Sequence, residues 1–421
     1  MGNVTQESLK IMFEIDPIIF TLSNGIKVAY LRREAFVAHL GVMIYAGSRF
    51  EHENEQGLAH FIEHCIFKGT KKRKALDIFS DLDCVGGELN AYTNKEEIGV
   101  HASFRKTHFE IASELLGDIV QNATFPEDEM VREKEVILDE IMSYLDSPMD
   151  RIQDDFEAHL FKGNSLGYNI LGSKKSVSGF TRDDIMKYVE RLFTPENMVI
   201  SFVGDLSIDQ LRDSLEKHFG GISRSGETVQ LNTILENPTF KIREKKSNYQ
   251  VHTILGGIAP SFNDDSRRAM TLATNLLGGP ALNSRLILSI REKHGYAYNV
   301  EASYTPYSDL GFWNIYLGTD KKYLKKAINL IHDELKIISD NPLSAQDIAG
   351  AKEQLKGHLA LALDSNLELM FNMGKSILVF GKIDPMSEVY RHIDEVSTEQ
   401  VQQIARTYFA PERISELIFE F

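Results

Sequence analysis

One stretch occurs twice in this chain, as TRDDIMKYVERLFTPENMVISFV (Thr181–Val203) and as STEQVQQIARTYFAPERISELIF (Ser397–Phe419). In each copy a Ser or Thr precedes an amphipathic segment, which is typical of a capped helix. A Pro-Glu pair and an apolar segment follow, which are typical of a turn and a strand. The Pro-Glu pairs are 216 positions apart (411 − 195), about half of the 421 residues. The spacing predicts two similar halves.

Two shorter echoes recur at almost the same offset. Leu58-Ala59 matches Leu272-Ala273, and Leu145-Asp146-Ser147 matches Leu363-Asp364-Ser365. Three matches at nearly one offset are more than chance would supply. They extend the predicted duplication over most of the chain.

The halves divide at residues 221–236, whose polar, Gly- and Ser-containing start is typical of a linker. We predict a first domain over residues 1–220 and a homologous second domain over 237–421. Strand-like segments such as Ile26–Leu31 are interleaved with helical ones such as Ala75–Asp83. The predicted class is α+β, with two homologous domains, each a mainly antiparallel β-sheet covered by helices on one face.

The composition is that of a soluble globular protein, with 43% apolar and 25% charged residues. No segment has the run of about 20 apolar residues that spans a membrane, and the start lacks a secretory signal pattern. We therefore expect a cytoplasmic protein that is not embedded in a membrane. A formal charge of −15 argues against a nucleic-acid partner. Cys65 and Cys84 are too far apart for a C-x-x-C motif and are expected to be buried thiols.

A possible metal site lies in the segment GLAHFIEHCIF, which runs from Gly57 to Phe67. A helix places His60 and His64 on one face, four residues apart, where two imidazoles can share one Zn²⁺. Glu63 lies beside them and can take a proton from a metal-bound water. This is the H-x-x-E-H arrangement. The alternative is a chance pattern on a solvated helix.

Catalytic zinc usually has three protein ligands, so a third should come from elsewhere. The predicted helix from Met130 to Leu145 carries two acids, Glu133 and Glu140, on the side that also holds the apolar residues Val136 and Ile137. Glu135 and Asp139 point the other way. Acids on an apolar stripe call for a cation, because burial of an unpaired carboxylate is unfavourable.

These segments together resemble the inverted-motif zinc peptidases typified by pitrilysin, insulin-degrading enzyme and mitochondrial processing peptidase. The resemblance covers nearly the whole chain and includes Gly47-Ser48-Arg49, Phe67-Lys68-Gly69-Thr70 and the 76-residue spacing (140 − 64) from the second histidine to the third ligand. It implies one Zn²⁺ per chain, held by His60, His64 and Glu140, with Glu63 as general base. It also implies that Glu133 orients a ligand.

Two further segments carry substrate-binding residues in the similar family. The resemblance implies that Arg291 and Tyr298 of the second half contact the substrate, and Tyr296 is a weaker candidate. The alternative is that Arg291 caps a helix and Tyr298 packs in a strand. The segment Gly86–Thr93 resembles the strand that receives the substrate as an added β-strand. Its expected binding residues are Gly87, Glu88, Leu89, Asn90 and Ala91, and an ordinary hairpin edge is the alternative.

The second half lacks metal ligands, because Thr274, Leu277 and Gly278 stand where the echo would place His60, Glu63 and His64. The resemblance implies a zinc metalloendopeptidase that acts on unfolded peptides inside a closed chamber. Because this chain has both the metal motif and the Arg-Tyr segment, we expect a homodimer. The alternative is a non-catalytic assembly or core subunit of the same fold.

Overall fold

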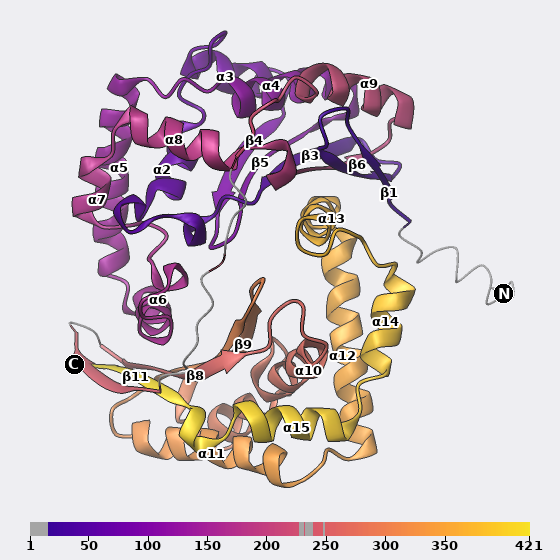
Figure 1. The fold of residues 1–421 in the computed structure, drawn as a ribbon. Coiled ribbons are helices and arrows are strands. Elements are labelled where there is room, and N and C mark those ends of the chain that lie inside the picture. Colours follow the sequence, from indigo (N-terminus) through magenta and orange to yellow (C-terminus); the bar gives the residue numbers. More distant parts are fainter. Residues whose placement is uncertain (1–15, 227–230, 232–238, 247–248) are drawn as a thin grey trace, which may run out of the picture. The chain divides into compact units, whose positions relative to one another are not determined.

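The structure is a computed structural model that describes residues 16–226, 231, 239–246 and 249–421 (Figure 1). They form two compact units, each drawn from separated parts of the chain. The first unit contains the chain up to residue 142, then 168–230 and 360–387. The second contains 143–167, 231–359 and 388–421. Most of the predicted linker, 221–236, lies outside the described residues, so the linear domain boundaries stay predictions.

The first unit is built on a six-stranded sheet with the order β1-β2-β6-β3-β5-β4. Only the β2–β6 pair is parallel, and the others are antiparallel. The strands are β1 (Ile18–Thr21), β2 (Lys27–Arg32), β3 (Val37–Ile44), β4 (Glu88–Thr93), β5 (Ile98–Arg105) and β6 (Met198–Gly204).

Helices cover both faces of this sheet. Side chains alternate along a strand, so Phe202 and Val203 of β6 face opposite ways. Phe202 contacts Phe109 of α4 (Phe109–Asn122), whereas Val203 packs with Met370 and Met373 of α13 (Asn366–Phe380). The predicted covering of one face alone is therefore wrong, because α13 arrives from the other half of the sequence.

The second unit repeats the arrangement with a five-stranded sheet, β7-β11-β8-β10-β9. Here β7 and β11 form the parallel pair, as β2 and β6 do in the first sheet. The strands are β7 (Lys241–Lys245), β8 (Val251–Ala259), β9 (Ala297–Pro306), β10 (Gly311–Thr319) and β11 (Ser415–Glu420). The matching order confirms the duplication and the α+β class.

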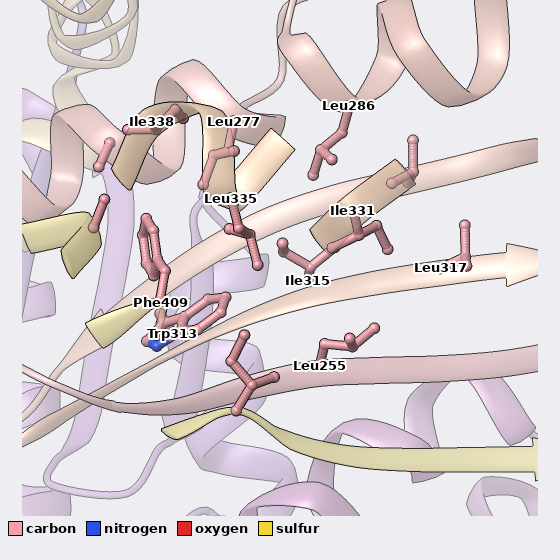
Figure 2. Packing of buried hydrophobic residues seen from close by; sticks show 14 of the residues in the cluster. Leu255, Leu277, Leu286, Trp313, Ile315, Leu317, Ile331, Leu335, Ile338 and Phe409 are labelled. Atoms are coloured by element: carbon pink, nitrogen blue, oxygen red, sulfur yellow. The ribbon is translucent and has the colours of Figure 1, made fainter. Parts of the chain in front are cut away.

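This second sheet also has two covered faces. On one, Trp313 and Ile315 of β10 pack with Leu335 of α11 (Leu324–Asp340), as Figure 2 shows. The same cluster includes Leu277 of α10 (Arg267–Gly278) and Phe409, which follows α15 (Thr398–Tyr408). On the other, Tyr316 of β10 packs with Phe156 of α6 (Pro148–Leu160), which comes from the first half of the sequence. The halves thus exchange one helix each.

The remaining helices connect and cover these sheets. They are α2 (Leu58–Cys65), α3 (Ala75–Asp83), α5 (Glu127–Leu145), α7 (Lys174–Gly179), α8 (Arg182–Leu192), α9 (Ile208–Phe219), α10 (Arg267–Gly278), α12 (Ala345–Asp364), α14 (Met386–Asp394) and α15 (Thr398–Tyr408). The helix starts expected from the repeat are confirmed, since the Thr181 and Ser397 side chains cap α8 and α15. Of the cysteines, Cys65 is buried but Cys84 is exposed, so the expectation for Cys84 is wrong. Within the described residues, no helix combines the length and apolar character needed to cross a membrane.

Candidate metal centre

Helix α2 begins at a tightly packed turn. Gly57 precedes it with φ +93°, a backbone conformation that favours glycine. A Cβ atom at Gly57 would lie 2.7 Å from the Cα atom of Gly172, so the site also lacks room for a side chain. The helix that follows places His60 and His64 on one face, with ring centroids 4.7 Å apart.

Helix α5 brings two acids to these histidines. An oxygen (Oε2) of Glu140 lies 3.8 Å from Nε2 of His60 and 3.5 Å from Nε2 of His64. Glu133 lies seven residues (140 − 133) before Glu140 on the same helix, about two turns away. Nδ1 of His64 donates a hydrogen bond to the Glu133 carboxylate at 3.1 Å. In the described part of the chain, His60, His64 and Glu140 are the one group of metal-binding side chains close enough to share an ion.

The three side chains fit a zinc ion. Zinc bonds to nitrogen and oxygen of about 2.0–2.1 Å at near-tetrahedral angles place ligand atoms about 3.3 Å apart. The distances of 3.5 and 3.8 Å need only small side-chain adjustments to reach that value. The donor set of two imidazoles and one carboxylate leaves a fourth position free, as catalytic zinc requires. The Glu140 side chain is 45% exposed, so at least this one of the three side chains is in contact with solvent.

Burial shifts the pKa values of two side chains in α2, His60 and Glu63. Burial and the nearby His64 ring lower the pKa of His60 to about 4, so the imidazole is neutral at pH 7 and can donate a lone pair to a metal. Burial also raises the pKa of Glu63 above its ordinary value, against the smaller opposing effects of Thr93 and His64. A raised pKa suits a carboxylate that accepts and returns a proton.

Glu133 is held from two sides. Besides the His64 hydrogen bond, its other oxygen accepts from Nζ of Lys68 at 2.6 Å. A carboxylate that binds the second ring nitrogen of a metal-binding histidine fixes both its tautomer and its orientation. The sequence suggested such a role for Glu133 by resemblance but gave none to Lys68, although Lys68 lies only four residues (68 − 64) after the motif.

The predicted apolar side of α5 is only partly buried. Ile137 and Glu133 are buried, as expected for the stripe, but Val136 is 50% exposed. Helical spacing places Val136 about 100° from Ile137, at the margin of the packed face. The stripe is therefore narrower than the sequence predicted, while both acids still face α2.

Strand β4 is the last strand of its sheet. One edge pairs with β5, and no described strand pairs with the other. Gly87 is buried just before the strand, and Glu88 and Asn90 are exposed on it, with Leu89 and Ala91 half-buried between them. An unpaired edge of this kind can accept an added strand.

The second unit places Arg291 and Tyr298 side by side. The Arg291 guanidinium carbon lies 5.1 Å from the centroid of the Tyr298 ring, a cation–π distance. Arg291 sits in a π-helical turn, η6 (Ile287–Glu292), and Tyr298 is 80% exposed near the start of β9. The weaker candidate Tyr296 instead stacks on Tyr323 and packs against the core. Tyr298 thus does not pack as a buried strand aromatic.

Comparison with known proteins identifies the family. The model described as Insulinase (Peptidase family M16) matches residues 27–174, and the model described as Peptidase M16 inactive domain matches residues 179–355. The zinc protease YmxG of Bacillus subtilis (strain 168) is 33% identical over 404 residues, covering 95% of this chain and 97% of that protein. This chain belongs to peptidase family M16. Another relative, the zinc protease ML0855 of Mycobacterium leprae, is 32% identical over 391 residues, covering 91% of this chain and 87% of its own.

Two solved structures share the fold of this M16 chain. One is described as a peptidase M16 inactive domain from Pseudomonas fluorescens, with a TM-score of 0.88 and 19% identity over 96% of this chain and 98% of that one. The other is a protease from Helicobacter pylori, with the same TM-score and identity, over 97% of this chain and 100% of its own. At this identity the likeness concerns the fold alone.

The inactive-domain match agrees with the side chains of the second half of this M16 chain. Thr274, Leu277 and Gly278 lie buried in α10, where they pack in the core and supply no metal-ligand set. The predicted family is thus confirmed, and the individual roles of the site residues stay predictions.

Proposed function

We propose that this M16 chain is a zinc metalloendopeptidase that hydrolyses internal bonds of unfolded peptides. The convergence of His60, His64 and Glu140 around one possible ion position carries the proposal. Glu63 adds a carboxyl group with a raised pKa in the same short helix. Relatives named as zinc proteases support the choice of metal and reaction class.

A zinc ion held by these three side chains would supply a Lewis acid that acidifies water and polarises a carbonyl group. Glu63 takes a proton from the attacking water and returns it to the leaving amine. Glu133 keeps the His64 ring in the orientation that directs Nε2 toward the metal, through the 3.1 Å bond to Nδ1. Arg291 and Tyr298 stabilise the developing negative charge on the substrate carbonyl.

The substrate binds as an extra strand beside β4. Main-chain hydrogen bonds to a sheet edge provide affinity for any extended peptide, so they favour unfolded substrates over a particular sequence. The residues proposed to bind the substrate at this edge are Gly87, Glu88, Leu89, Asn90 and Ala91. We also propose a homodimer, because a single chain type here carries both the metal ligands and the Arg-Tyr pair.

The test combines metal analysis with peptide hydrolysis. The purified protein should contain about one zinc ion per chain, lose hydrolysis of an unfolded fluorogenic peptide on chelation, and recover it when zinc is returned. The same cleavable sequence placed inside a stably folded domain should resist, since its backbone is already paired. Hydrolysis that survives complete metal removal would refute the proposal. Stoichiometric zinc without hydrolysis of any unfolded peptide would instead favour the non-catalytic subunit.

A further inference from the structure

A buried carboxyl group outside the metal site contacts the start of helix α2. Glu51 is 4% exposed. One of its oxygens (Oε2) accepts a hydrogen bond from the backbone N–H of Gly57 at 3.0 Å, and the other (Oε1) accepts from the N–H of Ala59 at 2.9 Å. Both donors lie in or next to the first turn of the helix that carries His60, Glu63 and His64.

The start of α2 depends on an outside partner. The first N–H groups of any helix lack acceptors within the helix, and a side chain at the cap position usually supplies one. Gly57 occupies that position and has no side chain. With only eight residues, Leu58–Cys65, the helix has few internal bonds, so its first turn is prone to fray. The two oxygens of the Glu51 carboxyl group supply the missing acceptors.

The segment that carries Glu51 is itself fixed to the end of β4. The N–H of Ser48 donates to the carbonyl of Asn94 at 3.1 Å, and the N–H of Arg49 donates to that of Lys95 at 2.7 Å. Nη1 of Arg49 also donates to the Glu96 carboxylate at 2.6 Å, and both side chains are nearly buried. The segment from Ser48 to Glu51 therefore joins the metal-binding helix to the turn that follows the proposed substrate strand.

Burial of the Glu51 carboxyl group is energetically unfavourable, because it removes the group from water. Burial raises its pKa to about 8, although the two backbone N–H groups act in the opposite direction. A buried carboxyl group is a poor choice where packing alone matters, because an apolar residue would avoid the loss of hydration. An apolar residue at position 51 could not accept the two hydrogen bonds from α2, and these bonds offset the unfavourable burial of the Glu51 carboxyl group.

We propose that Glu51 is a positioning residue that fixes the first turn of α2 and thereby the directions in which His60 and Glu63 project. Its effect on the metal rests on the function proposed above. Its effect on the helix does not, so the two can be measured separately.

The experiment compares Glu51→Ala and the milder Glu51→Gln with Ser207→Ala. Ser207 is a matched control, because it is the N-cap residue of α9 in the same unit. Its side chain accepts a hydrogen bond from the N–H of Gln210, and its described hydrogen bonds involve no site residue. Zinc affinity is measured by competition with a chelator. Amide hydrogen exchange of the metal-free proteins is measured over residues 58–65 and 208–219.

Glu51→Ala should weaken zinc binding about tenfold or more, as loss of a residue that orients ligands does, and should lower kcat more than it changes KM. It should also lower protection from exchange across α2, with Glu51→Gln intermediate. Ser207→Ala should lower protection in α9 alone and keep zinc affinity within about twofold. The proposal is overturned if α2 protection is unchanged in both Glu51 variants, or if Ser207→Ala weakens zinc binding equally. If the parent protein binds no zinc, the proposed function fails, and the exchange of α2 still decides the role of Glu51.

Discussion

Replacement of Glu133 tests how the proposed metal-binding histidine His64 is held in position. The Glu133 carboxylate accepts from Nδ1 of His64 at 3.1 Å and from Nζ of Lys68 at 2.6 Å, with little solvent exposure. Loss of a hydrogen bond to a charged group costs about 1.5–3 kcal/mol, or about 10- to 100-fold in an equilibrium constant. In Glu133→Gln the amide oxygen can still accept from His64, so we expect about tenfold weaker zinc binding. Glu133→Ala removes both contacts and should approach 100-fold.

The assay is a chelator competition at pH 7.5, with activity measured at saturating zinc. Glu135→Gln is the matched control, because Glu135 lies on the same helix but is exposed. Added zinc should restore most of the turnover of Glu133→Gln, since the three proposed ligands remain. Zinc affinity within twofold of the parent protein in Glu133→Ala would refute the orienting role. An equal loss in Glu135→Gln would assign the effect to the charge of the helix as a whole.

Four further outcomes are expected. Glu63→Gln should retain about one zinc ion per chain by metal analysis yet lose most of its peptide turnover, because the amide cannot accept a proton. Arg291→Ala and Tyr298→Phe should each keep metal and thermal stability but lower kcat/KM about 100-fold, the usual size for one donor to a developing oxyanion; unchanged kcat/KM would leave them without a catalytic role. Burial lowers the pKa of His101 to about 4, so on acidification the unfolded chain binds a proton at this residue before the folded chain does, and the free energy of unfolding falls between pH 6.5 and 4. His101→Leu should make this fall smaller in urea titrations of the metal-free protein at several pH values. A chain of residues 1–220 lacks α13 and should aggregate or melt well below the full chain in a thermal scan; a stable monomer would contradict the packing role of that helix.

Local patterns in the sequence predicted much of the candidate site. Helical spacing placed His60 and His64 on one face of α2, and it placed Glu133 and Glu140 on the side of α5 that faces them. Helical spacing alone left open which of the two acids is the third ligand. Resemblance to the family then predicted Glu140 as the ligand and Glu133 as the residue that orients a ligand. Such contacts depend on short segments whose geometry is nearly fixed by helix periodicity.

The sequence did not predict the contacts made by irregular segments. Glu51 lies just after a short 3-10 turn, and no periodic pattern indicates which N–H groups its carboxyl group meets. Lys68 follows α2, and its approach to Glu133 depends on how two helices pack. The π-helical turn around Arg291 also has no signature in hydrophobic spacing. Each of these features is set by tertiary structure.

The exchanged helices show what a repeat can and cannot reveal. The repeated Leu-Asp-Ser segments end at Ser147 and Ser365, and these two serines immediately precede α6 and α13. The sequence therefore marked the two helices as equivalent. It did not show that each covers the sheet made mainly by the other half, because similarity between segments says nothing about which partner each contacts. The apolar face of such a helix could cover either sheet, because its hydrophobic pattern is the same in both cases. Only the path of the chain decides which sheet the helix packs on. The exchange makes each sheet depend on both halves, so neither linear half contains a complete core of its own.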